Sequence, residues 1–187
     1  AYGYSEVVAA DERNSPEIRT EAKANVARDA MTMAMGPRAR KADFLASWGE
    51  DSINGAEWQW ITKSLSAYGD LKKNGPAVLQ AEASYYEALI LYLYGSHTAS
   101  NEEIFWLIDN LPGQGEWRFK ALLILAHNYA ALDDVFQANY TLDFIIAENF
   151  IAETVEQAKV FQAILNSPAE DAAGPDEETI SEMPTLP

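Results

Sequence analysis

Apolar residues recur along the chain at the spacing of α-helices, and glycine and proline separate the recurring stretches. Between residues 55 and 74, for example, Trp58, Ile61, Leu65 and Tyr68 follow one another at intervals of three and four, which places them on one helical face. No run of alternating Val, Ile and Thr stands out, as it would in a half-buried strand. The pattern therefore predicts an all-α protein.

Local signals mark the ends of the predicted helices. Ser15 and Pro16 suit the N-cap and the first helical position, and they provide the first clear helix start. The spacing of a capping box marks later starts at Ser100, Asp134 and Thr154. The helices predicted from these signals span residues 16–35, 37–48, 55–74, 77–94, 100–111, 116–132, 134–149 and 154–165.

The second half of the chain repeats itself with a period of 38 residues. A shift by that period places small residues on small ones, where two helices of a hairpin approach closely, and bulky residues on bulky ones. The matched pairs are Ala88 with Ala126, Gly95 with Asp133, Ser100 with Ala138, Ile104 with Leu142, Leu107 with Ile145 and Ile108 with Ile146. Two antiparallel helices in each period predict a helical solenoid.

The repeat also resembles a known family. Leu125, Ala126, Tyr129, Leu132, Asp134, Ala138 and Leu142 stand at positions that are typical of a tetratricopeptide repeat, whose usual unit has about 34 residues. Ala126 and Asp133 replace glycines of the family pattern. The stretch 115–150 is similar to the last repeats of large bacterial envelope proteins of this family. The resemblance implies a right-handed α-solenoid over residues 1–166, with three to four hairpins and a C-terminal capping helix.

The resemblance further implies a function in binding. Members of this family act as noncatalytic scaffolds for protein partners or as subunits of larger assemblies, and the first helix of each pair lines the concave face. This nominates seven partner-binding residues: Glu82, Tyr85, Leu89, Tyr92, Lys120, Leu123 and His127. Tyrosine and leucine would supply buried anchors, whereas the charged and imidazole groups would set the register. The same resemblance favours a periplasmic or outer-membrane-associated location.

Charge is distributed unevenly along the chain and narrows the choice of partner. Residues 1–73 carry 10 Lys and Arg against 11 Asp and Glu, whereas residues 74–187 carry 3 against 18. A field of this sign repels nucleic acid and anionic lipid headgroups, so we expect a protein partner with a basic or mixed surface. No apolar stretch approaches the roughly 18 residues that a membrane span requires.

The last 21 residues, 167–187, differ from the rest of the chain. They contain six acidic residues, four prolines and no basic residue. Such a segment buries too little apolar surface to offset the entropy lost on ordering. We therefore predict a separate acidic, proline-rich tail that is disordered in isolation.

Motifs for catalysis, metal binding and cofactor binding are missing from the sequence. The chain has no cysteine, and its two histidines, His97 and His127, lie outside any metal-ligand spacing. The acidic pairs Glu102-Glu103 and Asp133-Asp134 lie at predicted helix starts, where capping explains them. No glycine-rich phosphate loop and no nucleophile with its base are recognisable. The sequence therefore predicts no catalytic residue, no metal and no cofactor.

Aromatic residues leave one alternative open. Five tryptophans and nine tyrosines could provide stacking platforms for sugars, as in outer-membrane glycan-binding proteins with helical repeats. That alternative requires exposed Trp or Tyr side chains flanked by Asn and Asp. Because Trp58 and Trp60 cannot share one helical face, we expect one of them in the core and the other exposed or against a neighbouring repeat.

Overall fold

The computed structural model describes residues 2–36, 43–46 and 55–167. Within these ranges the chain forms eight α-helices and no strand, which confirms the all-α prediction there. The helices are α1 (Tyr2–Ala10), α2 (Pro16–Met35), α3 (Gly55–Asn74), α4 (Ala77–Leu93), α5 (His97–Asn110), α6 (Gly115–Ala131), α7 (Val135–Glu148) and α8 (Ala152–Leu165). Residues 168–187 of the predicted tail lie outside the described residues.

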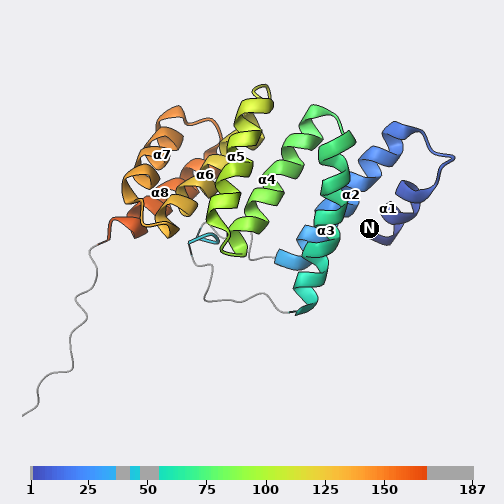
Figure 1. The fold of residues 1–187 in the computed structure, drawn as a ribbon, viewed down its shortest axis with the longest axis horizontal. Helices are drawn as coiled ribbons and strands as arrows, with labels where there is room; N and C mark the ends of the chain where they lie inside the picture. The colour runs from blue at the N-terminus through green and yellow to red at the C-terminus, as the bar shows by residue number, and fades with distance from the viewer. Residues whose placement is uncertain (1, 37–42, 47–54, 168–187) are drawn as a thin grey trace, which may run out of the picture.

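The helices are stacked in a row in the order of the chain (Figure 1). Each helix packs against the next one, and α4 also packs against α6, as α6 does against α8. Helices α4, α6 and α8 thus form one continuous layer, whereas α5 and α7 each pack against two members of it. This packing is consistent with a helical-repeat architecture.

The 38-residue period of the sequence is also a period of the structure. Both ends of α4 lie 38 residues before the corresponding ends of α6, and the same holds for α5 and α7. The turns within the two hairpins match as well, because Gly95 and Asp133 both have a positive φ, of 75° and 61°. Ala88 and Ala126 are both fully buried, as expected where small side chains allow two helices to approach closely.

Several predicted helix ends are confirmed. The Ser15 side chain accepts a hydrogen bond from the Ile18 N–H, and Gly36 caps the end of α2 with φ 55°. The Asp134 carboxylate accepts from the Gln137 N–H at 3.1 Å, so the capping box predicted at the start of α7 is correct at its Asp134 side. The predicted boundaries of α2, α3 and α7 agree with the structure to within one residue.

Two predicted caps are wrong. Helix α5 begins at His97, so Ser100 lies inside it, and its hydroxyl donates to the Ala88 carbonyl of α4 instead of capping. Helix α8 begins at Ala152, so Thr154 is a buried helical residue and not an N-cap. In both cases the helix starts two or three residues earlier than the cap spacing predicts.

The first 48 residues hold two further differences. The sequence marked no helix before Ser15, yet residues 2–10 form α1, which packs against α2. The Asn14 side chain donates to the Val8 carbonyl and ties the two helices together. The helix predicted over 37–48 is wrong at residues 43–46, which form a turn, and its other residues lie outside the described ranges.

Candidate binding groove

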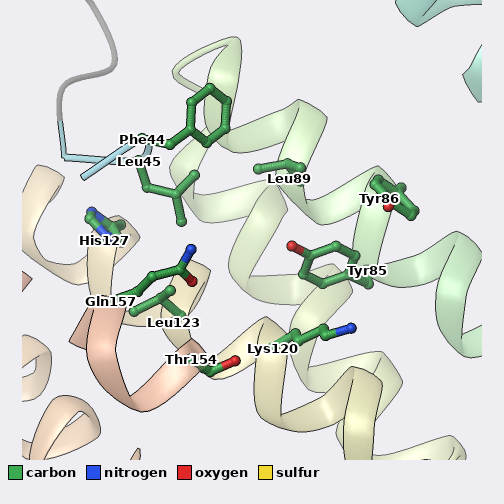
Figure 2. A pocket seen from close by; sticks show the side chains of 10 residues that line it. All are labelled: Phe44, Leu45, Tyr85, Tyr86, Leu89, Lys120, Leu123, His127, Thr154 and Gln157. Atoms are coloured by element: carbon green, nitrogen blue, oxygen red, sulfur yellow. The ribbon is translucent and has the colours of Figure 1, made fainter. Parts of the chain in front are cut away.

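A hollow lies on one side of the layer formed by α4, α6 and α8. Its cavity has a volume of about 160 Å³. Side chains of three helices and of the short segment 43–46 surround it, as Figure 2 shows. They are Phe44, Leu45, Tyr85, Tyr86, Leu89, Lys120, Leu123, His127, Thr154 and Gln157. Five of the seven residues nominated from the sequence therefore line one cavity.

Helix α4 contributes the aromatic wall of the cavity. Tyr85 and Leu89 lie one turn apart on the same face, and the Tyr86 ring stacks on the buried Tyr68 ring of α3 at 4.9 Å. The Tyr85 ring packs against Trp117 of α6 at 5.4 Å. Burial raises the pKa of both Tyr85 and Tyr86 above the ordinary value, so both rings are neutral at physiological pH.

Helix α6 contributes Lys120, Leu123 and His127, whose spacing of three and four places them on one face. The Lys120 ammonium donates to the Glu116 carboxylate at 2.6 Å and lies 4.6 Å from the centre of the Trp117 ring. Because the Lys120 side chain is still partly exposed, it remains accessible to an incoming group.

His127 is buried at the base of the cavity. Its imidazole stacks on the Phe161 ring of α8, with ring centres 3.5 Å apart. Burial lowers the pKa of His127 to about 3, so the ring is neutral at physiological pH. A neutral imidazole of such low basicity is a poor general base near neutral pH.

A second, more polar hollow of about 180 Å³ continues the first one. The two hollows share Tyr85, Tyr86, Lys120, Thr154 and Gln157, and the second one adds Trp117 and Glu153. We call the two hollows together the groove. It therefore has an apolar end beside Leu45, Leu89 and Leu123, and a polar end at which Lys120 and Glu153 carry opposite charges.

The structure places Glu82 away from the groove. Only 2% of this residue is exposed, and its carboxylate pairs with the Arg28 guanidinium of α2. The Tyr68 hydroxyl donates to the same carboxylate at 2.9 Å. Hydrogen bonding to Glu82 raises the pKa of Arg28, and burial raises the pKa of Tyr68. Glu82 therefore joins helices, in place of the partner contact expected from the sequence.

Tyr92 is also outside the lining of the groove, although it supports it. Its hydroxyl donates to the Leu45 carbonyl at 2.7 Å, and its ring packs against His97 and His127. Burial raises the pKa of Tyr92 to about 12, so this donor keeps its proton at physiological pH. The residue holds the segment 43–46 against α4.

Five residues that line the first hollow were not nominated from the sequence: Phe44, Leu45, Tyr86, Thr154 and Gln157. The last two lie on α8, which the sequence assigned to a capping helix, although the solenoid pattern makes α8 the next member of the layer after α6. No sequence signal placed Phe44 and Leu45 beside α6 and α8. Their position depends on contacts between segments that are distant in the chain.

Trp58 and Trp60 are both half-buried and lie against other parts of the protein. Trp58 stacks at 4.1 Å on Tyr94, the residue that caps the end of α4, and Trp60 packs edge-on against Tyr2 of α1 at 5.0 Å. Trp60 thus lies against another helix, which is one of the two positions expected for the second tryptophan, whereas Trp58 is half-buried and not fully in the core. Trp106, at 37% exposure, lies on α5, away from the groove.

Comparison with known proteins adds no relative from which a function could be proposed. No match is found when the chain is compared with known protein families, curated proteins and solved structures. The described ranges hold no group of three His, Asp or Glu side chains that would bind a metal ion. No helix in them is long and apolar enough to cross a bilayer.

Proposed function

We propose that this chain is a noncatalytic protein-interaction module, a right-handed tetratricopeptide-like solenoid whose groove binds a segment of a partner protein. The observation that carries the proposal is the convergence of apolar, aromatic and polar side chains from α4, α6 and α8 on one groove. Solenoids of stacked hairpins present such concave surfaces to extended partners. A larger assembly that contains this chain as a subunit would use the same surface.

The composition of the groove suits recognition of a peptide. Leu89 and Leu123 offer an apolar floor for an anchor side chain, and the tyrosines provide large rigid contacts. At the polar end, Lys120 and Glu153 can set the register of a segment through hydrogen bonds. The strongly acidic second half of the chain favours a partner with a basic or mixed surface.

The titratable groups of the groove argue against catalysis. His127 has its pKa lowered to about 3, and Lys120 is paired with Glu116. With so low a basicity, His127 is a poor general base near neutral pH. The resemblance to envelope proteins extends the proposal to a bacterial periplasmic or outer-membrane location.

A pair of matched charge reversals tests the proposed function. Lys120→Glu changes the groove, whereas Lys159→Glu makes the same change on the exposed surface of α8. The tagged chain is crosslinked in extract of the source cells, and captured proteins are quantified. We expect a defined protein to be lost with Lys120→Glu and retained with Lys159→Glu. Equal capture by both variants would contradict binding in the groove.

Glycan binding is the second candidate, and the wall of Tyr85, Tyr86 and Trp117 at the polar end favours it. Aromatic faces of this kind also stack on sugar rings. An oligosaccharide array distinguishes the two functions. Binding of a glycan that is lost with Trp117→Ala, together with no protein captured through Lys120, would replace the protein-binding proposal.

A further inference from the structure

One segment of the chain already lies on the groove. Residues 43–46 belong to the connection between α2 and α3, yet Phe44 and Leu45 line the same cavity as His127 of α6 and Gln157 of α8. In Figure 2 the Leu45 side chain points from this segment into the space between α4 and α8. Phe44 is only 8% exposed.

The contacts of this segment are those of a bound peptide. The Tyr92 hydroxyl donates a hydrogen bond to its main chain, at the Leu45 carbonyl, over 2.7 Å. Its two apolar side chains act as anchors, and Leu45 packs against both hydrophobic clusters of the protein. Main-chain hydrogen bonding combined with side-chain anchors is the usual way in which a groove recognises a peptide segment.

We propose that the apolar end of the groove recognises an aromatic–aliphatic pair, and that Phe44-Leu45 is an internal ligand that competes with the partner for it. This inference rests on the proposed function and names the partner by its chemistry. The partner segment carries a Phe-Leu-like pair, whose second residue accepts a hydrogen bond from Tyr92 through its carbonyl.

The charge of the sequence around the internal pair indicates what should flank the pair in a partner. Arg38, Arg40 and Lys41 precede it in the sequence, whereas residues 74–167, which include helices α4 to α8, hold 3 basic against 12 acidic residues. Opposite charge raises the rate of association and helps to select the partner. A basic stretch next to the apolar pair therefore completes the recognition signal.

Competition by an attached segment has a predictable size. A tethered ligand acts at an effective concentration on the order of millimolar. A free segment with the same contacts, present at micromolar concentration, would therefore bind the intact protein weakly. Removal of the internal anchors should restore its affinity by about 10-fold or more.

The probe for the test is a fluorescein-labelled peptide with the sequence of residues 40–49, RKADFLASWG. Its binding is measured by fluorescence anisotropy to the wild-type chain, to Leu45→Ala and to the double variant Phe44→Ser/Leu45→Ser. A control peptide has serine in place of the Phe-Leu pair. Circular dichroism establishes that each protein is folded, and Leu45→Ala decides the question if the double variant does not fold.

We expect the peptide to bind the double variant about 10-fold or more tightly than the wild type, with Leu45→Ala in between, and the control peptide to bind none of them. Equal affinity for the three proteins, no binding to a folded variant, or equal binding of the control peptide would overturn the inference. If the peptide does not bind but Lys120→Glu still loses a native partner, only this inference is contradicted and the proposed function stands. Peptide binding without any Lys120-dependent partner contradicts the proposed function alone.

Discussion

Arg28 of α2 and Glu82 of α4 form a two-point ion pair, although 54 residues separate them in the chain. The guanidinium donates from Nε to Oε1 at 2.7 Å and from Nη2 to Oε2 at 2.6 Å. Since the Tyr68 hydroxyl of α3 donates to the same carboxylate, Glu82 joins three helices. This cluster connects the first helices to the layer that carries the groove.

Loss of this buried carboxylate should destabilise the fold strongly. Glu82→Ala removes the carboxylate that accepts hydrogen bonds from the Arg28 guanidinium and the Tyr68 hydroxyl. We expect this substitution to lower the free energy of unfolding by about 3 kcal/mol. Urea denaturation measures the change. Glu21→Ala is the matched control, because its exposed carboxylate pairs with the same Arg28 at 3.1 Å. The control should cost about 0.5 kcal/mol or less, and equal losses would contradict this role of Glu82.

Substitutions at the two hairpin turns should change the stability in opposite directions, because glycine is favoured at both positions. Asp133 adopts φ 61°, where Gly95 of the preceding repeat has φ 75°. A left-handed conformation is costly for a residue with a Cβ atom and easy for glycine. Asp133→Gly should therefore stabilise the protein by up to about 1 kcal/mol, and Gly95→Ala should destabilise it by about 1 kcal/mol. Thermal denaturation measures both, and a stabilising Gly95→Ala would refute this explanation.

A buried polar chain links α5 to α6 and should be sensitive to its central member. The Asn128 side chain donates to the Ser100 hydroxyl at 2.8 Å and bonds His97 Nδ1 at 3.0 Å. Asn128→Ala should cost about 2 kcal/mol in chemical denaturation, because buried polar partners are left unpaired. Asn139→Ala, which breaks a pair with Asn166 at the surface, should cost about 0.5 kcal/mol or less. A costlier Asn139 variant would show that the assignment of the buried network is wrong.

His127 should make the fold sensitive to acid. Burial lowers its pKa in the folded protein to about 3, whereas the unfolded chain has an ordinary value of about 6.5. Below pH 6.5 the unfolded state takes up a proton that the folded state does not, so stability falls as the pH falls from 6.5 toward 3. The loss approaches about 1.4 kcal/mol for each pH unit.

A variant without the imidazole isolates this contribution. His127→Leu lacks the titrating group and keeps an apolar contact with Phe161, so its stability relative to the wild type should improve steadily from pH 6.5 to pH 4. Denaturation curves at several pH values measure the difference between the two proteins. A difference that stays constant with pH would show that His127 is not buried in its neutral form.

Periodic and local features of the fold were predictable from the sequence. The 38-residue period placed two hairpins in register, because matching positions of the repeat carry similar side chains. The Asp134 cap marked the start of α7, because a cap depends only on residues close together in the sequence. Helix α1 carries no cap signal and buries no residue fully, so its packing against α2 left no mark in the periodicity. The cap predicted at Ser100 is wrong because its hydroxyl donates to the Ala88 carbonyl, which lies on another helix and leaves no local signal in the sequence.

The sequence predicted that α4 and α6 line the groove, but it did not predict every residue that does so. Tyr85, Lys120 and Leu123 were nominated because the first helix of each pair lines the concave face in the family that the repeat resembles, and all three line the groove. Glu82 shares that helical face, and only the distant Arg28 explains why it is buried in an ion pair. The positions of Phe44 and Leu45 depend on where the connection between α2 and α3 runs. Such contacts between distant segments have no sequence period.

Site-specific photocrosslinking tests the central claim most directly. A photoreactive phenylalanine analogue replaces Lys120 in the groove or Lys159 on the exposed surface of α8, and each tagged chain is irradiated in extract of the source cells. Mass spectrometry identifies the protein joined to each position and the crosslinked residue. Our account predicts that position 120 joins one defined segment of a protein, with a basic stretch beside an aromatic–aliphatic pair, and that position 159 does not. Crosslinks of the same protein at position 159 alone, or none at position 120, would contradict binding in the groove.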